Sequence, residues 1–469
     1  MSSDEDERLN DDPFHPLGEA AEENYKAMLE ETEYDADLGM EMARDALRLT
    51  KGDISEEEFY DRYHEDVLEE FGEDSRPMAE RIEQAREEGR LERALSRFGD
   101  DEDSRRDVMK KMGVGAAAVG LGAWGTAESG GEPEPDVAAA QEDGGHGGGH
   151  GEGGGTQWGM ALDLEVCDGC LACVVACNQE HNWNEGANWM YILAYEDGTV
   201  ESPSPDNFDD TRDFNMLIRP CQHCTDAPCE KVCPTTARHT RDEGGIVLTD
   251  YDVCIGCRYC QVACPYGVNY FQWEEPYVDA PSDELSEDMM YDERGRWVSG
   301  RGPRGVMQKC VFDPARQDGN MGEDMVGRTA CEDACPPGAI QFGDMNDPES
   351  DPQQYLENVP LARAREVDPD DQELQDAITT LEEGEDAGGM SEEEAERLLR
   401  GEYGSADSTF KLLEEYNTNP NVVYIGNEPG PNAKQVPGPV AYEDVGMVDN
   451  EKNVLEDETV NYGLGGLSL

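Results

Sequence analysis

The stretch Cys254-Ile255-Gly256-Cys257-Arg258-Tyr259-Cys260-Gln261-Val262-Ala263-Cys264-Pro265 decides the fold. Its first three cysteines lie three residues apart, and the fourth follows after three intervening residues and precedes a proline. A loop with this spacing wraps three corners of an iron–sulfur cubane, while the fourth thiolate reaches a neighbouring cluster. Gly256 lets the loop bend and brings backbone N–H groups close to the sulfur atoms. The stretch therefore predicts an iron–sulfur cluster site.

Three related motifs surround this stretch. They are Cys167-x2-Cys170-x2-Cys173-x3-Cys177, Cys221-x2-Cys224-x4-Cys229-x3-Cys233-Pro234 and Cys310-x2-Asp313-x17-Cys331-x3-Cys335-Pro336. The four motifs account for all 15 cysteines. Residues 163–177 recur as 250–264, and residues 229–237 recur as 331–339. This internal repeat predicts a duplicated two-motif domain.

Three other uses of cysteine fit the motifs less well. A structural zinc site needs only two Cys-x2-Cys pairs, so the third and fourth cysteines of each motif would be superfluous. Disulfides between close neighbours in sequence are poor structural bridges, and 15 is an odd number. Inert buried cysteines have no reason to follow a fixed spacing.

Asp313 stands where the fourth motif requires a cysteine. A carboxylate is a harder ligand than a thiolate, so the iron at that corner should be labile. The site could hold a 4Fe-4S cluster with Asp313 as a ligand, or a 3Fe-4S cluster with Asp313 nearby. Of these two we favour the three-iron form.

Charge and hydropathy exclude several classes of function. The 469 residues contain 36 Lys and Arg against 108 Asp and Glu, which gives a net charge of −72. Such a polyanion repels nucleic acid and anionic lipid. No apolar run is long enough to span a bilayer. Because the acidic residues are spread along the whole chain, we expect a source that lives in molar salt, which screens their repulsion.

The composition divides the chain into six segments. Two of them are acidic and predicted helical, with Ser55 and Ser391 as helix caps. The segments are an acidic helical module (1–103), a signal-like segment (104–127), a Gly/His-rich linker (128–156), the cysteine-rich domain (157–347), an acidic helical insertion (348–408) and a C-terminal segment (409–469). We expect an α+β fold, in which two bacterial-ferredoxin-like units carry the acidic helical extension and insertion.

The signal-like segment resembles a twin-arginine export signal. Arg105 and Arg106 precede a short apolar run from Met112 to Trp124, and a small-residue site lies near Ala127. Its position, after about a hundred residues, is unusual for such a signal. We expect export and a peripheral place on the outer face of the cytoplasmic membrane, or a cytoplasmic protein if the signal is not used.

Residues 157–347 resemble the four-cluster ferredoxin-type subunit of the complex iron–sulfur molybdoenzymes, including polysulfide reductase and alternative complex III. The resemblance is carried by 219–224, 254–260 and 263–267, and by 342–348, 412–418 and 423–425. It implies four ligand sets. They are group 1 (Cys167, Cys170, Cys173, Cys335), group 2 (Cys177, Cys310, Asp313, Cys331), group 3 (Cys221, Cys224, Cys229, Cys264) and group 4 (Cys233, Cys254, Cys257, Cys260).

The resemblance also implies the function. Groups 1, 3 and 4 would hold 4Fe-4S clusters, and electrons would pass between a membrane subunit that reacts with quinone and a large molybdopterin subunit. No carboxylate pair, nucleophile triad or nucleotide loop calls for substrate chemistry in this chain. Two alternatives stay open at this point: a self-contained reductase with its chemistry at the Asp313 cluster, and a zinc-binding assembly protein.

Overall fold

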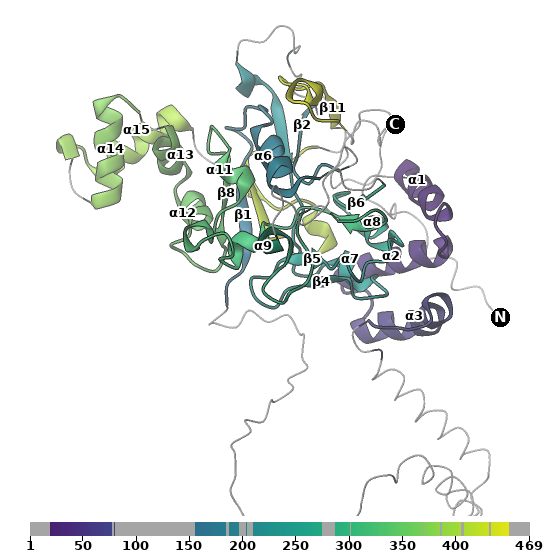
Figure 1. Ribbon diagram of the computed structural model, residues 1–469. Coiled ribbons are helices and arrows are strands. Elements are labelled where there is room, and N and C mark those ends of the chain that lie inside the picture. Colours follow the sequence, from purple (N-terminus) through teal and green to yellow (C-terminus); the bar gives the residue numbers. More distant parts are fainter. Residues whose placement is uncertain are drawn as a thin grey trace, which may run out of the picture. The chain divides into compact units, whose positions relative to one another are not determined.

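A computed structural model describes residues 19–76, 79 and 155–449, with gaps at 184–186, 197–202, 204–209, 274–286, 301, 368, 385–386, 405–407 and 431–432. The chain divides into two units, residues 1–77 together with 155–469, and residues 78–154. The elements named below belong to the first unit (Figure 1). The predicted export signal (104–127) and almost all of the linker lie outside the described residues.

A four-stranded sheet has the order β8-β1-β10-β9. β1 (Trp158–Asp163) pairs antiparallel with β8 (Ile340–Asp344) and parallel with β10 (Val422–Ile425), which pairs antiparallel with β9 (Thr409–Phe410). β1 is buried from its second residue onward, as expected for an apolar strand between two neighbours. Three distant parts of the chain therefore meet at the strand that precedes Cys167.

A similar strand pair lies where the first repeat copy ends and the second begins. β4 (Arg238–Thr240) follows Cys233 and pairs antiparallel with β5 (Val247–Thr249), which precedes Cys254. β8 follows Cys335 and pairs in the same way with β1. One hydrogen bond recurs at equivalent positions: Asp163 N donates to Ala339 O and Asp250 N donates to Ala237 O, both at 2.8 Å. Each pair joins the strand before a three-cysteine loop to the strand after a Cys-x3-Cys-Pro unit.

Two smaller sheets complete the β structure. One has the order β11-β2-β3 and the other contains only β6 and β7. Their strands are β2 (Tyr191–Glu196), β3 (Asn215–Arg219), β11 (Lys434–Val436), β6 (Tyr270–Phe271) and β7 (Met307–Gln308).

The helices near the cysteines are short. They are α6 (Ala172–His181), α7 (Pro228–Lys231), α8 (Tyr259–Val262), α9 (Glu287–Met290), α10 (Pro314–Gln317) and α11 (Ala330–Asp333). Short 3-10 turns lie at Thr211–Asp213, Glu323–Met325, Ala387–Gly389, Glu414–Tyr416 and Tyr442–Val445. Strands mixed with short helices agree with the predicted α+β class.

Three acidic helices, α1 (Glu19–Glu30), α2 (Ala36–Thr50) and α3 (Glu56–Phe71), form the N-terminal part of this unit. Ser55 caps α3 as predicted, because its side chain accepts from Glu58 N. The helices pack on the loop that holds Cys257 and Cys260: Tyr259 OH donates to Asp35 O at 2.6 Å, and the ring of Tyr259 meets Phe71 edge-on. His64 is buried, and its Nδ1 lies 2.8 Å from Asp74 Oδ2.

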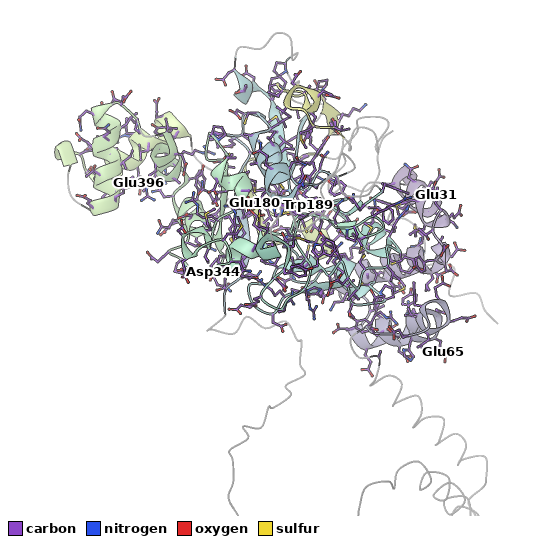
Figure 2. All side chains as sticks on the ribbon, viewed as in Figure 1. Glu31, Glu65, Glu180, Trp189, Asp344 and Glu396 are labelled. Carbon is purple, nitrogen blue, oxygen red and sulfur yellow. The ribbon has the colours of Figure 1, made fainter. Side chains whose placement is uncertain are left out.

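The predicted insertion is also helical. It contains α12 (Asp351–Glu357), α13 (Val359–Val367), α14 (Gln372–Glu383) and α15 (Glu392–Tyr403), and Ser391 with Glu394 forms the predicted capping box. Leu361, Ala377 and Leu399 lie in a small core of their own. Its helix α15 carries the exposed carboxylate of Glu396, and the N-terminal part carries the exposed carboxylates of Glu31, just after α1, and Glu65 on α3 (Figure 2).

Candidate metal centres

All fifteen cysteines lie within the described residues and none is in a disulfide. Twelve are buried, whereas Cys170, Cys254 and Cys335 are partly exposed. Loops place most of the thiols, and residues with positive φ shape these loops: Gly169 and Leu171 flank Cys170, and Gly256 and Arg258 flank Cys257. A Cβ on Gly256 would lie 2.0 Å from the carbonyl oxygen of Gly305, so this position needs glycine.

The thiols of group 1 share one small apolar cavity. Cys167, Cys170, Cys173 and Cys335 line it together with side chains that include Ile192, Ile218 and Ile340. Burial, and to a smaller degree the neighbouring Cys335, raises the pKa of the Cys167 thiol to about 12. The structure thus brings the last cysteine of the fourth motif to the first three cysteines of the first motif.

A second cavity is lined by the members of group 2. Cys177, Cys310, Asp313 and Cys331 face it, and so do His181 and Trp189. The cavity is closed by Met160, Met190, Val311 and Phe312. The last cysteine of the first motif therefore lies beside the fourth motif.

Groups 3 and 4 are brought together in the same crosswise way. Burial raises the pKa of Cys229, the Arg238 guanidinium lowers it, and the neighbouring Cys264 and Cys221 raise it. Burial likewise raises the pKa of Cys257, with Cys233 and Cys260 as the next contributions. Each three-cysteine set thus has the last cysteine of the other motif as a neighbour.

The four groups follow one another in a row. Burial is the main cause of each raised pKa, but a cysteine of the next group also raises it at three thiols. Cys331 of group 2 raises the pKa of Cys173 in group 1, and Cys221 of group 3 raises that of Cys310 in group 2. Cys260 of group 4 raises that of Cys229 in group 3. These contributions place group 2 beside groups 1 and 3, and group 3 beside group 4. The three partly exposed cysteines all belong to the terminal groups 1 and 4.

Backbone amides donate to several of the sulfur atoms. Ala339 N lies 3.2 Å from Cys335 Sγ, Arg238 N lies 3.3 Å from Cys233 Sγ, and Met307 N lies 3.4 Å from Cys254 Sγ. Such bonds stabilise thiolates, which are the ligands of iron–sulfur clusters. Because burial raises the pKa of most of these thiols, metal binding must displace their protons.

Asp313 is held by hydrogen bonds on both carboxylate oxygens. Oδ1 lies 2.5 Å from His181 Nε2, and Oδ2 accepts from Ala330 N at 2.7 Å. Burial alone would raise the pKa of Asp313, but His181, the Ala330 amide and Arg316 hold it below its usual range. His181 packs on Trp189, and Arg316 bonds to Glu180; Figure 2 labels both of these partners. The sequence predicted the position of Asp313 but not these partners.

Two buried cations also lie among the thiols. Lys309 Nζ donates to the carbonyl oxygens of Val247 and Cys310. Arg238 is 1% exposed; its Nη2 bonds to Asn269 Oδ1 at 2.7 Å and lies 3.6 Å from Cys260 Sγ. Arg238 Nε and Nη1 have no hydrogen-bond partner among the described residues. These orphaned donors, the clustered thiols and the apolar linings fit buried, negatively charged iron–sulfur clusters.

Comparisons with known proteins agree with this geometry. Residues 15–79 match the N-terminal region of 4Fe-4S ferredoxin iron–sulfur binding proteins, and residues 212–282 match the 4Fe-4S dicluster domain. A putative iron–sulfur subunit of dimethyl sulfoxide reductase from Halobacterium salinarum is 38% identical over 205 residues, which is 43% of this chain and 71% of the relative. The chain belongs to the family of ferredoxin-type iron–sulfur subunits of the molybdoenzyme reductases.

Two further relatives of this iron–sulfur subunit come from bacteria. The menaquinone reductase iron–sulfur cluster-binding subunit of Nitratidesulfovibrio vulgaris is 38% identical, over 41% of this chain and 77% of the relative. The arsenate respiratory reductase iron–sulfur subunit ArrB of a Shewanella species is 35% identical, over 42% of this chain and 86% of the relative. Members of the family transfer electrons within respiratory reductases.

Proposed function

We propose that this subunit relays electrons through four iron–sulfur clusters between a quinone-reactive membrane subunit and a molybdopterin-type catalytic subunit. The observation that carries the proposal is the row of four cysteine groups, whose terminal members alone include partly exposed thiols. Partners at the two ends could then exchange electrons with the row. The iron–sulfur subunits of reductases to which the chain is similar support this role.

In this proposal groups 1, 3 and 4 hold three 4Fe-4S clusters with four thiolates each. Group 2 offers three thiolates and Asp313, so it holds a 3Fe-4S cluster or a 4Fe-4S cluster with a carboxylate ligand. Both oxygens of Asp313 are already hydrogen-bonded, which supports the three-iron form. Bound clusters supply one-electron redox chemistry, and the chain supplies ligands, amide donors and a dry surrounding.

The metal content of the purified holoprotein tests the cofactor proposal. We expect about 15 irons per chain with matching sulfide, and electron paramagnetic resonance signals after reduction. Cys254→Ser should remove the signal of one cluster, whereas the exposed neighbour Asp252→Asn should remove none. About four zinc ions per chain and no iron would instead indicate an assembly protein.

The partners and the location form a separate part of the proposal. We propose export through the twin-arginine pathway and a peripheral place on the outer face of the membrane. Within the described residues, no helix is long and apolar enough to cross a bilayer. Purification of the tagged chain from its native membranes should recover a multi-span subunit and a molybdopterin subunit. Replacing Arg105 and Arg106 by lysine should trap the chain inside the cell; unchanged export would contradict the targeting proposal.

A further inference from the structure

The internal repeat places different charges at equivalent positions of the two terminal groups. Arg238 directly follows Ala237 of one Cys-x3-Cys-Pro-x2-Ala unit, and Ile340 directly follows Ala339 of the other. Arg238 serves group 4: its amide donates to Cys233 Sγ and its guanidinium lies 3.6 Å from Cys260 Sγ. Ile340 lines the cavity of group 1. A buried cation in one copy thus corresponds to an apolar side chain in the other.

A second pair of equivalent positions differs in the opposite sense. Asp168 follows Cys167 in group 1, and Ile255 follows Cys254 in group 4. Asp168 lines the cavity of group 1, and its Oδ1 accepts from Cys170 N at 3.3 Å. Group 1 therefore has an anion where group 4 has an apolar side chain.

Both differences act on reduction in the same direction. Reduction of a cluster adds one electron, and no bond is made or broken. A fixed positive charge stabilises the added electron and a fixed negative charge opposes it, most strongly where water is excluded. The guanidinium keeps its charge at every relevant pH. Arg238 also has two nitrogen atoms, Nε and Nη1, that no described residue engages and whose N–H groups can donate to cluster sulfur.

We propose that Arg238 and Asp168 set the order of potentials along the row, so that the cluster of group 4 has a higher midpoint potential than the cluster of group 1. The inference rests on the proposed function, because it requires clusters at both groups. Electrons are then more stable at the end of the row that holds Cys254 than at the end that holds Cys170 and Cys335. Transfer from group 1 towards group 4 is the downhill direction.

Redox titration of the holoprotein, followed by electron paramagnetic resonance, tests the order. The signals are assigned beforehand with Cys170→Ser, which removes the group 1 cluster, and Cys254→Ser, which removes the group 4 cluster. In the unaltered protein we expect the group 4 signal to appear at the higher potential. The reverse order, or equal potentials, would overturn the inference.

Four variants then test the residues. Arg238→Met should lower the equilibrium constant for reduction at group 4 at least tenfold, which is about 59 mV for one electron. Arg238→Lys, which keeps the charge, should lower it less. Asp168→Asn should raise the potential of group 1, by a smaller amount because Asp168 is partly exposed. Arg241→Gln is the matched control, since Arg241 is buried nearby but bonds to Asp318 and the Glu243 carbonyl.

The outcomes separate the inference from the proposed function. If the unaltered protein lacks iron, sulfide and signals, the proposed function fails. If its signals are present and neither Arg238→Met nor Asp168→Asn shifts a potential in the stated direction, only the inference fails. If Arg238→Met loses the group 4 cluster, Asp168→Asn and the order of the potentials in the unaltered protein still decide the question, because asparagine has nearly the same size as aspartate.

Discussion

Arg363→Met is expected to destabilise the protein severely. Arg363 on α13 is 5% exposed and forms a bidentate pair with Asp163 at the end of β1, at 2.7 and 2.9 Å. It also donates to Glu165 and to the carbonyl oxygen of Tyr403. Methionine fills a similar volume but leaves the Asp163 carboxylate buried with only its remaining donors, among them Tyr355 OH at 3.0 Å.

The magnitude follows from burial of the pair. Breaking a buried ion pair by removing one partner costs about 3–5 kcal/mol. For a unit of this size, that corresponds to a fall of roughly 4–7 °C in the unfolding midpoint. The matched control is Arg365→Met on the same helix, because Arg365 pairs with Glu382 while both side chains are about 40% exposed. An exposed pair of this kind contributes about 0–1 kcal/mol.

The assay is thermal unfolding of the holoprotein by circular dichroism at one fixed scan rate, since cluster proteins often unfold irreversibly. Asp163→Asn and the double variant complete a thermodynamic cycle that isolates the coupling between Arg363 and Asp163. If Arg363→Met lowers the midpoint no more than Arg365→Met does, the buried pair is not what attaches the helical insertion to β1.

Three further changes have defined outcomes. Asp313→Cys gives group 2 a fourth thiolate, so iron should rise from about 15 to about 16 per chain and the signal of an oxidised three-iron cluster should disappear; absence of that signal from the unaltered protein would contradict the three-iron form, and its persistence in the variant would show that position 313 does not set the cluster type. Burial lowers the pKa of His239 to about 4. In the unfolded chain His239 therefore binds a proton near pH 6.5, whereas in the folded chain it stays neutral down to about pH 4. The midpoint of thermal unfolding should fall as the pH drops from about 6.5 towards 4. His239→Gln should reduce the dependence of the unfolding midpoint on pH in this range. An equal dependence in both proteins would show that His239 is not its cause. Ser391→Ala should weaken the start of α15 by about 1 kcal/mol, seen as faster amide hydrogen exchange there; unchanged exchange would show that the capping box contributes nothing.

Local features of the sequence predicted local features of the structure. The cysteine spacing predicted the ferredoxin family. Ser391 and Glu394 form both bonds of their capping box. Ser55 accepts from Glu58 N as predicted, but the Glu58 side chain bonds to Arg62 instead of returning to the cap, because Arg62 lies one helical turn away with an opposite charge.

Contacts between distant segments could not be predicted from these patterns. Nothing near Arg363 indicates that its partner is Asp163, 200 residues earlier in the chain. Arg238 resembles any other arginine of the sequence until the fold buries it beside Cys260. His181 likewise becomes the partner of Asp313 only when α6 is placed against the fourth motif. Burial and pairing are set by tertiary packing, which local spacing does not encode.

The place of β1 bears on how the subunit is made. Its neighbours in the sheet, β8 and β10, both come from the far side of the last cysteine motif. About 260 residues separate Asp163 from Ile425, and a ribosome adding 5–20 residues per second needs roughly 13–50 s to produce them. During that interval the cysteines of the first motif lack the strands β8 and β10, which pair with β1 in the folded protein. Insertion of the clusters is therefore expected after translation. Until then, shielding the free thiols of the nascent chain from oxygen and zinc would favour correct assembly.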